Sequence, residues 1–125
     1  MNIIISTSSM VPIYEQICGR IRSMIATGEL ASGTALPSVR ALAAQLKISA
    51  LTVKKAYDCL EAEGLCATVH GKGTYVTAEN TALLQEQQQM EIEKDLIKII
   101  ERAKNYGIDK EQFLELAAMI FEESL

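Results

Sequence analysis

The segment SVRALAAQLKISALTVKKAYDCLEAEG, residues 38–64, is the most informative part of this 125-residue chain about its architecture. Apolar residues recur in it at helical spacing, first at Val39, Leu42, Ala43 and Leu46, and then at Val53, Ala56, Tyr57 and Leu60. Ser38 and Ser49 precede the two stretches as expected N-caps, and Gly64 marks the end of the second. Because three residues, 47–49, separate them, the two short helices predict a helix-turn-helix.

The flanking segments complete a winged version of this motif. Residues 12–27 predict a helix that begins at Pro12 and ends before Gly28, and residues 31–38 read as a turn. After Gly64 comes CATVHGKGTYV, residues 66–76, whose alternating small, β-branched and aromatic residues predict a β-hairpin. Glycines at its bend permit positive φ, so His70 and Lys72 are expected at an exposed tip, which is the wing.

Beyond residue 77 the composition becomes rich in Glu and Gln, and the pattern predicts a long helix over residues 80–105. A last helix is expected from Asp109, with Gln112 in a capping box. These helices carry more apolar surface than the pair can hide, which predicts burial against a second copy of the chain. The expected dimer-interface residues are Ile92, Leu96, Ile99, Ala103, Phe113, Leu116 and Ile120.

The predicted fold class is therefore mainly α with a small β-hairpin, divided into a winged helix-turn-helix DNA-binding domain at 1–77 and a helical hairpin for dimerisation at 78–125. The charge follows the same division. Residues 1–77 hold seven Lys or Arg against five Asp or Glu (+2), and residues 78–125 hold five against eleven (−6), for a total of −4. This distribution is typical of a nucleic-acid-binding module joined to a protein-binding module.

The hydropathy pattern and the cysteine spacing exclude several other classes of protein. The chain has no apolar run of eighteen residues and its start lacks a signal-peptide pattern, so we expect a cytoplasmic protein without a membrane partner. The cysteines, Cys18, Cys59 and Cys66, form no CxxC pair and predict reduced, packed thiols with no metal site and no cofactor.

Four motifs, PIYEQICGRIRSMIATGEL, LPSVRALAAQL, TVKKAYDCLEAEGL and HGKGTYV, together resemble the N-terminal domain of the GntR family of bacterial transcription regulators over residues 11–76. The short helical tail is similar to that of the YtrA-type subfamily, whose members dimerise through two C-terminal helices. The resemblance implies a repressor that binds a palindromic operator as a homodimer, with residues 50–63 in the major groove and residues 70–73 at the minor groove or phosphates.

The resemblance also implies a set of DNA-binding residues: Ser38, Arg40, Ser49, Thr52, Lys54, His70, Gly71 and Lys72. The family more often has Arg at position 54, so Lys54 keeps the charge without the bidentate fork. Ala50 and Leu51 stand at positions that in the family commonly hold Arg or Pro and then Asn. Leu51 can still contact a thymine methyl group, whereas Ala50 is expected only to pack against the preceding turn.

Two other classes of function compete with DNA binding. An enzyme is disfavoured, because the single His lies on the wing and no nucleophile and base can be paired with a third group behind them. A protein-binding winged module is the second alternative, and salt separates it from a DNA-binding one, since phosphate contacts weaken steeply with ionic strength. A small-molecule effector, the operator sequence and the regulated genes are unknown at this stage.

Overall fold

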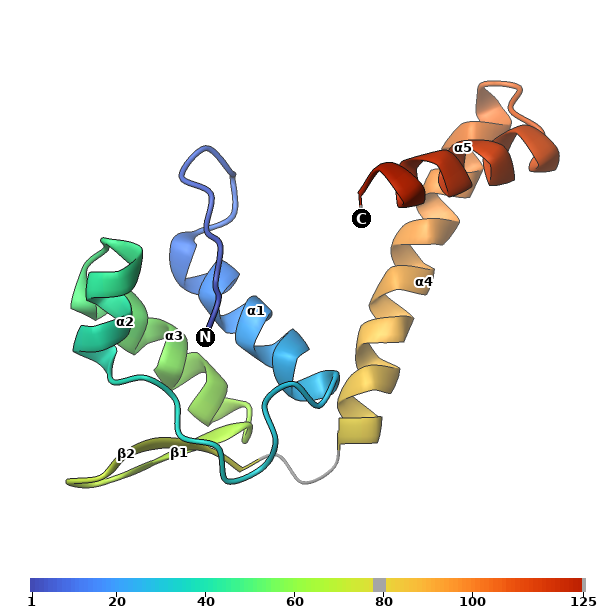
Figure 1. Cartoon of the computed structure of the whole chain (residues 1–125). Coiled ribbons are helices and arrows are strands. Elements are labelled where there is room, and N and C mark those ends of the chain that lie inside the picture. The colour runs from blue at the N-terminus through green and yellow to red at the C-terminus, as the bar shows by residue number, and fades with distance from the viewer. Residues whose placement is uncertain (78–80, 125) are drawn as a thin grey trace. The chain divides into compact units, whose positions relative to one another are not determined.

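The structure, a computed structural model, describes residues 1–77 and 81–124 of the chain. Its elements, in chain order, are α1 (Ile13–Ala26), α2 (Val39–Leu46), α3 (Ala50–Ala62), β1 (Cys66–Val69), β2 (Gly73–Val76), α4 (Thr81–Asn105) and α5 (Lys110–Glu123) (Figure 1). They form two compact units, Met1–Gln85 and Glu86–Leu125. The predicted mainly α fold with a small β-hairpin in a winged helix-turn-helix is confirmed, while the expected start of the long helix at residue 80 lies outside the described residues.

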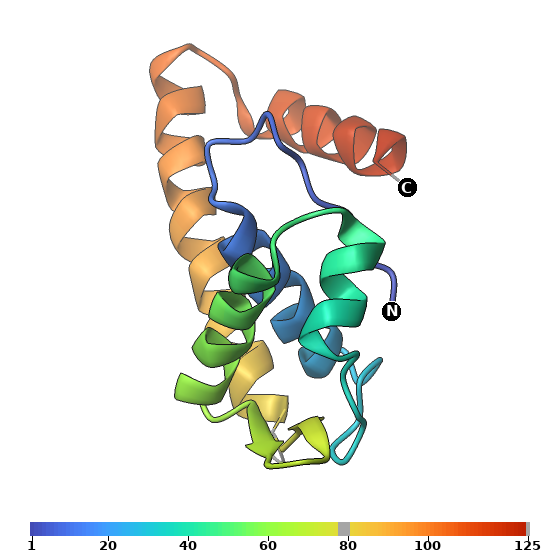
Figure 2. The same ribbon diagram turned by 90° about the vertical axis from the view of Figure 1, so that its left-hand side faces the viewer.

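The two helices of the helix-turn-helix begin directly after the predicted N-cap residues, Ser38 and Ser49. The Ser38 hydroxyl accepts a hydrogen bond from the Ala41 N–H at 3.1 Å, and the Ser49 hydroxyl accepts one from the Thr52 N–H at 3.2 Å. Each side chain thereby satisfies one of the unpaired donors of a helix N-terminus. Between the helices Lys47 adopts a left-handed conformation with φ 57° and ends α2. The chain can therefore reverse within three residues and place α3 across α2 (Figure 2).

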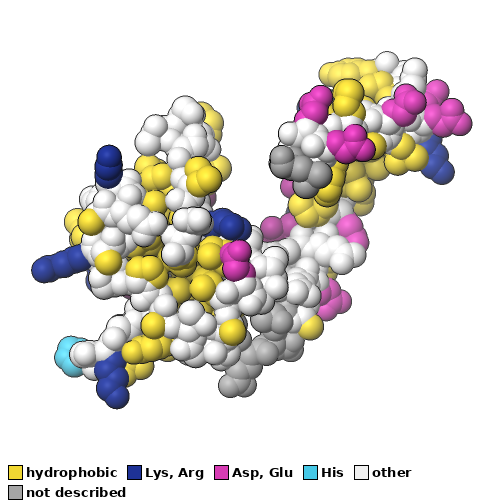
Figure 3. All heavy atoms as spheres, in the orientation of Figure 1, with side chains coloured by type: hydrophobic (Ala, Val, Ile, Leu, Met, Phe, Trp, Pro, Cys, Tyr) yellow, Lys and Arg dark blue, Asp and Glu magenta, His cyan; other side chains and the backbone are white. Residues whose placement is uncertain are grey.

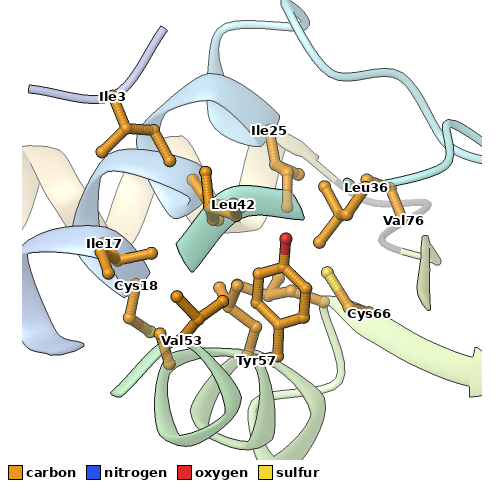
Figure 4. Close-up of a cluster of buried hydrophobic side chains, with 14 of the residues drawn as sticks. Ile3, Ile17, Cys18, Ile25, Leu36, Leu42, Val53, Tyr57, Cys66 and Val76 are labelled. Carbon is orange, nitrogen blue, oxygen red and sulfur yellow. The ribbon is translucent and has the colours of Figure 1, made fainter. Parts of the chain in front are cut away.

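The core of the first unit lies among α1, α2, α3 and the wing. Side chains from all of these elements converge on one cluster (Figure 4). The residues with no exposed surface are Ile17, Ile21, Ile25, Leu42, Val53, Ala56 and Leu60. These are members of the apolar faces that helical spacing predicts, because residues at i, i+3, i+4 and i+7 share one side of a helix. Tyr14, in the first turn of α1, is only half-buried.

The wing contains a third segment that the sequence pattern does not predict. Strands β1 and β2 are antiparallel, with Cys66 opposite Val76 and Val69 opposite Gly73. On the far side of β2, the Leu36 N–H donates to the Thr74 carbonyl and the Val76 N–H donates to the Thr34 carbonyl, both at 2.9 Å. Residues 31–38, which were predicted to be a turn, therefore also contribute backbone hydrogen bonds to β2. These hydrogen bonds connect the base of the wing to the loop before α2.

The ends of the first unit are held by packing that local patterns do not reveal. Ile3 is 5% exposed and belongs to the core, and the Gln16 side chain holds the N-terminal segment by donating to the Ser6 carbonyl at 2.9 Å. At the other end, Leu84 is 9% exposed and the Gln85 amide donates to the Ala26 carbonyl. The first turn of α4 therefore belongs to the winged unit, which extends past residue 77 to Gln85.

The second unit consists of the rest of α4 and all of α5. The predicted capping box at Asp109 is confirmed, because its carboxylate accepts from the Gln112 N–H at 2.8 Å and its N–H donates to the Gln112 side chain at 3.0 Å. Gly107, with φ 79°, lets the chain leave α4 in the left-handed region. None of the described helices is long and apolar enough to cross a membrane.

One buried hydrogen bond of the first unit can be tested directly. The Tyr57 hydroxyl donates to the Pro37 carbonyl at 2.7 Å, and Tyr57 is 4% exposed. Replacing Tyr57 with Phe leaves that carbonyl without its donor, so we expect the free energy of unfolding to fall by about 1–3 kcal/mol in urea titrations. The control is Tyr106→Phe, because Tyr106 is 75% exposed. Equal stability of the two variants would contradict this role for the Tyr57 hydroxyl.

Candidate nucleic-acid interface

The first part of the candidate interface is the N-terminus of α2. Ser38 and Arg40 are both exposed there, and the Ser38 hydroxyl is engaged as the helix cap. The first N–H groups of a helix have no partner within it, and the helix dipole places partial positive charge at this end. An exposed guanidinium beside such an end makes a site suited to a phosphate oxygen.

The second part is the outward face of α3. Leu51 is 79% exposed, although leucine on a helix is usually covered. Lys54 lies one turn further along, and its ammonium pairs with the Asp58 carboxylate at 3.1 Å with 62% of its side chain exposed. The Thr52 and Ser49 hydroxyls lie 3.4 Å apart. The structure therefore brings Ser49, Leu51, Thr52 and Lys54 together at the first turns of one helix.

The third part is the tip of the wing, where His70, Gly71 and Lys72 are all exposed. The Lys72 N–H donates to the Val69 carbonyl at 2.9 Å, which closes the turn. Gly71 has φ 78° and Gly73 has φ 123°, conformations that a residue with a Cβ rarely adopts. The backbone of the tip is therefore held by the hairpin, while its His and Lys side chains project away from the core.

Charge pairing distinguishes this surface from the rest of the first unit. Each carboxylate of residues 1–77 has a donor, in the pairs Tyr14–Glu15, Arg20–Glu29, Lys54–Asp58, Thr68–Glu61 and Arg22–Glu63. The Lys55 ammonium lies 4.0 Å from the centroid of the Tyr14 ring. Among the described residues, no side-chain partner exists for Arg40, Lys47 or Lys72. The Lys and Arg side chains of the unit that have no such partner among the described residues therefore lie on α2, on the turn after it and on the wing.

The side of the molecule that carries these elements is visible in Figure 3, where dark blue side chains project from the region of α2, α3 and the wing. Lys47 is one of the cations without a side-chain partner among the described residues, but it is not among the DNA-binding residues predicted from the sequence. The sequence did contain a signal for Lys47, because it is a basic residue inside the predicted three-residue turn at 47–49. Its left-handed backbone, which is unusual for a residue with a side chain, makes the turn tight and leaves the ammonium in solvent.

The cysteines are arranged differently from what their sequence spacing indicates. Cys18 on α1 and Cys59 on α3 lie close together, and their sulfur atoms and a Glu63 oxygen are all within 4.8 Å of one another. Burial raises the pKa of the Cys18 thiol to about 12, with a further contribution from its hydrogen bond with Cys59. Burial likewise raises the pKa of Cys66 to about 11. Cys66 is the residue that remains an isolated packed thiol.

The second unit presents an apolar surface. The side chains of α4 expose 66% of Ile92, 42% of Leu96 and 45% of Ile99, and those of α5 expose 41% of Leu116 and 52% of Ile120. Leu96, Ile99, Phe113, Leu116 and Ile120 also line a groove of about 470 Å³. Ala103 differs from the other selected positions, because it is 8% exposed and packs within the hairpin.

Comparison with known proteins agrees with this arrangement. Residues 13–76 match the family of bacterial regulatory proteins called gntR. The chain is similar to the HTH-type transcriptional repressor YtrA of Bacillus subtilis (strain 168), with 36% identity over 111 residues that cover 89% of this chain and 85% of that protein. A crystal structure of a transcriptional regulator from Oenococcus oeni superposes with a TM-score of 0.72 at 35% identity, covering 94% of this chain and 97% of that one.

A solved protein–DNA complex is also similar to part of the chain. The DNA-binding domain of AraR in complex with operator ORX1 superposes with a TM-score of 0.54 at 32% identity, covering 59% of this chain and 92% of that one. These comparisons confirm the family resemblance inferred from the four sequence motifs, and they place the chain among regulators rather than enzymes. The chain belongs to the GntR family of bacterial regulatory proteins and is a DNA-binding transcription regulator.

Proposed function

We propose that two copies of this chain join through α4 and α5 and bind a palindromic operator, where they repress transcription. In each copy α3 enters the major groove, and the wing tip contacts the minor groove or its phosphates. Bacterial operators lie in the cytoplasm, so the protein acts there. The observation that carries the proposal is the set of unpaired cations, Arg40, Lys47 and Lys72, around an α3 face whose Leu51 is 79% exposed.

Each element of this surface has a separate task in the proposal. Arg40 and the N-terminus of α2 hold a phosphate, which sets the register of the protein on the duplex. Leu51 and Thr52 reach base edges, and the leucine favours a thymine methyl group over a G·C pair. Lys54 exchanges its Asp58 partner for a phosphate or a purine acceptor, because a pair that is mostly exposed contributes little to stability.

The apolar surface of the second unit is the observation that supports a dimer. Residues such as Ile92 and Leu116 are largely exposed on the isolated hairpin, and covering them with an identical surface removes apolar area from water. The interface we propose consists of Ile92, Leu96, Ile99, Phe113, Leu116 and Ile120, with Ala103 supporting it from inside the hairpin. Repression is supported by the similar protein YtrA, which is named a repressor.

Selection of DNA from a random pool tests this function. The full-length protein is incubated with the pool, bound DNA is amplified over several rounds, and the products are sequenced. We expect a two-fold symmetric site with half-sites about one helical turn apart, because two α3 helices related by a dimer axis read successive major grooves. Recovery of unrelated sequences at every salt concentration would favour the alternative that the winged unit binds protein.

Substitution of Lys72 tests the wing. Lys72→Ala should weaken binding to operator and to unrelated DNA by similar factors, since a phosphate contact carries no sequence information. It should also reduce the slope of log K against log salt by about one unit, because one fewer counterion is released. The measurement is a titration of labelled operator at several salt concentrations. Lys94→Ala, an exposed position on α4, is the control, and an identical slope for both variants would remove the wing from the interface.

A further inference from the structure

Two pairs of polar side chains face each other between α1 and α3, away from the proposed DNA-binding surface. Cys18 and Arg22 are one turn apart on α1, and Cys59 and Glu63 are one turn apart at the end of α3. The Cys59 sulfur lies 3.7 Å from Glu63 Oε1, and both sulfurs and this carboxylate lie within 4.8 Å of one another. Three metal-ligand atoms therefore meet at one place, although Cys18 and Cys59 are far apart in the sequence.

The cluster is accessible from solvent. Cys18 is only 1% exposed, but it lines a surface pocket of about 380 Å³ together with Cys59, Glu63 and Arg22. The Glu63 side chain is 36% exposed at the rim of this pocket. An ion can therefore reach the buried sulfur through the pocket without any rearrangement of the helices, and space remains for a water molecule as a fourth ligand.

The distances are close to those of a tetrahedral site. With metal–sulfur bonds of about 2.3 Å and a metal–oxygen bond of about 2.1 Å, neighbouring ligand atoms are roughly 3.6–3.8 Å apart. The Cys59–Glu63 separation of 3.7 Å already matches, and the remaining separations, at most 4.8 Å, require a contraction of about 1 Å or less. Rotation of the cysteine and glutamate side chains supplies movements of this size.

Arg22 orients the glutamate and balances its charge. Its Nε donates to Glu63 Oε2 at 2.9 Å and its Nη2 donates to Oε1 at 2.5 Å, while Oε1 also lies 3.7 Å from the Cys59 sulfur. Its Nη2 also lies 3.4 Å from the Cys18 sulfur. Two thiolates and one carboxylate carry three negative charges, which a divalent cation and this guanidinium neutralise together. A carboxylate held in this way by a neighbouring group is typical of the surroundings of metal ligands.

We propose that Cys18, Cys59 and Glu63 bind one thiophilic divalent cation of the Zn²⁺ class, with Arg22 positioning the carboxylate. Thiolate ligands select Zn²⁺ and Cd²⁺ over the hard ions Mg²⁺ and Ca²⁺, which prefer oxygen. Binding forms two metal–sulfur bonds and one metal–oxygen bond, and the two thiol protons leave to solvent. Because its ligands come from both α1 and α3, the bound ion links the helix that carries Leu51 and Lys54 to the helix that supports it.

The proposal is tested with Cd²⁺ as the probe, added to the reduced full-length protein under a phosphine reductant and without oxygen. Coordination by two thiolates produces a sulfur-to-cadmium charge-transfer band in the ultraviolet, and we expect it to saturate at one ion per chain. Zn²⁺ should compete for the same site and abolish the band, whereas Mg²⁺ should not. Zn²⁺ should also raise the thermal midpoint, because an ion that binds only the folded state stabilises it.

Variants of Cys59 and Glu63 test two of the three proposed ligands, and a third variant is the control. Cys59→Ser, at a half-buried position, should lower Cd²⁺ affinity by at least roughly tenfold and weaken the band, and Glu63→Gln should lower the affinity while leaving both sulfurs in place. Cys66→Ala is the matched control, because it removes a buried thiol outside the cluster. Absence of the band in the unsubstituted protein, or affinities for Cys59→Ser and Glu63→Gln equal to that of Cys66→Ala, would overturn the proposal.

Discussion

The double variant Leu96→Asp/Ile99→Asp is expected to be a monomer that no longer binds its operator tightly. The two side chains are 42% and 45% exposed on the isolated hairpin, and they line the same apolar groove as Phe113 and Ile120. In the proposed dimer they face a second copy, so aspartates there would place uncompensated charges in a buried interface. Such charges destabilise the dimer, whereas on the monomer they remain in water.

Loss of the dimer should weaken operator binding much more than any single contact does. When two winged units are joined, binding of the second half-site is intramolecular, which typically strengthens binding by a factor of about 10² to 10⁴. A monomer loses this factor, although each winged unit retains its own surface. Its core should persist, because residues such as Ile21, Leu42 and Leu60 are buried within the first unit.

Sedimentation equilibrium measures the oligomeric state, and operator titration measures the binding loss. Circular dichroism shows whether the winged unit remains folded. The control is Gln87→Asp/Lys94→Asp, which also introduces two aspartates on α4 but at exposed polar positions outside the proposed interface. A Leu96→Asp/Ile99→Asp protein that sediments as a dimer of unchanged affinity would contradict the proposed interface.

Arg40→Ala should have the second-largest effect on DNA binding. Arg40 is exposed at the N-terminus of α2 and has no side-chain partner among the described residues. A charge-assisted contact with a phosphate or a guanine is worth about 1–3 kcal/mol, so operator affinity should fall roughly five- to 150-fold. Stability should change little, because the substitution removes no buried group and no ion pair.

Two further variants separate the charge of Arg40 from its geometry. Arg40→Lys should recover part of the affinity if the contact is to a phosphate, and little of it if the fork of the guanidinium reads a guanine edge. Arg20→Ala is the control. Arg20 lies on α1, outside the proposed interface, and its guanidinium pairs with the Glu29 carboxylate at 3.8 Å. Affinity retained by Arg40→Ala at moderate salt would mean that Arg40 is a solvated helix residue without a role in binding.

Local features of the fold were predictable from the sequence. Ser38, Ser49 and Asp109 cap the helices as expected, and the apolar face of α3 is buried at Val53, Ala56, Tyr57 and Leu60. These features depend on hydrogen bonds and spacings within a few residues, which the order of amino acids contains directly. The family membership was predictable for the same reason, since each of its motifs is a continuous segment.

The candidate site was only partly predictable. Arg40 and Lys72 were predicted from the sequence, but only the structure shows that other cations, such as Arg20 and Arg22, are paired with carboxylates, whereas these two and Lys47 have no such partner in the described part of the chain. Such pairing depends on which helix faces meet. Arg22 and Glu63 are 41 residues apart, and no local periodicity connects them.

The helices, the hairpin, the caps and the family could therefore be predicted from the order of amino acids alone. Tertiary structure decided the pairing of residues 33–36 with β2, the burial of Leu84 that extends the winged unit to Gln85, and the meeting of Cys18 with Cys59 and Glu63. The physical reason is the range of the interactions. Helices and turns are stabilised by groups close together in the chain, whereas these contacts join segments that are distant in sequence and require those segments to pack together.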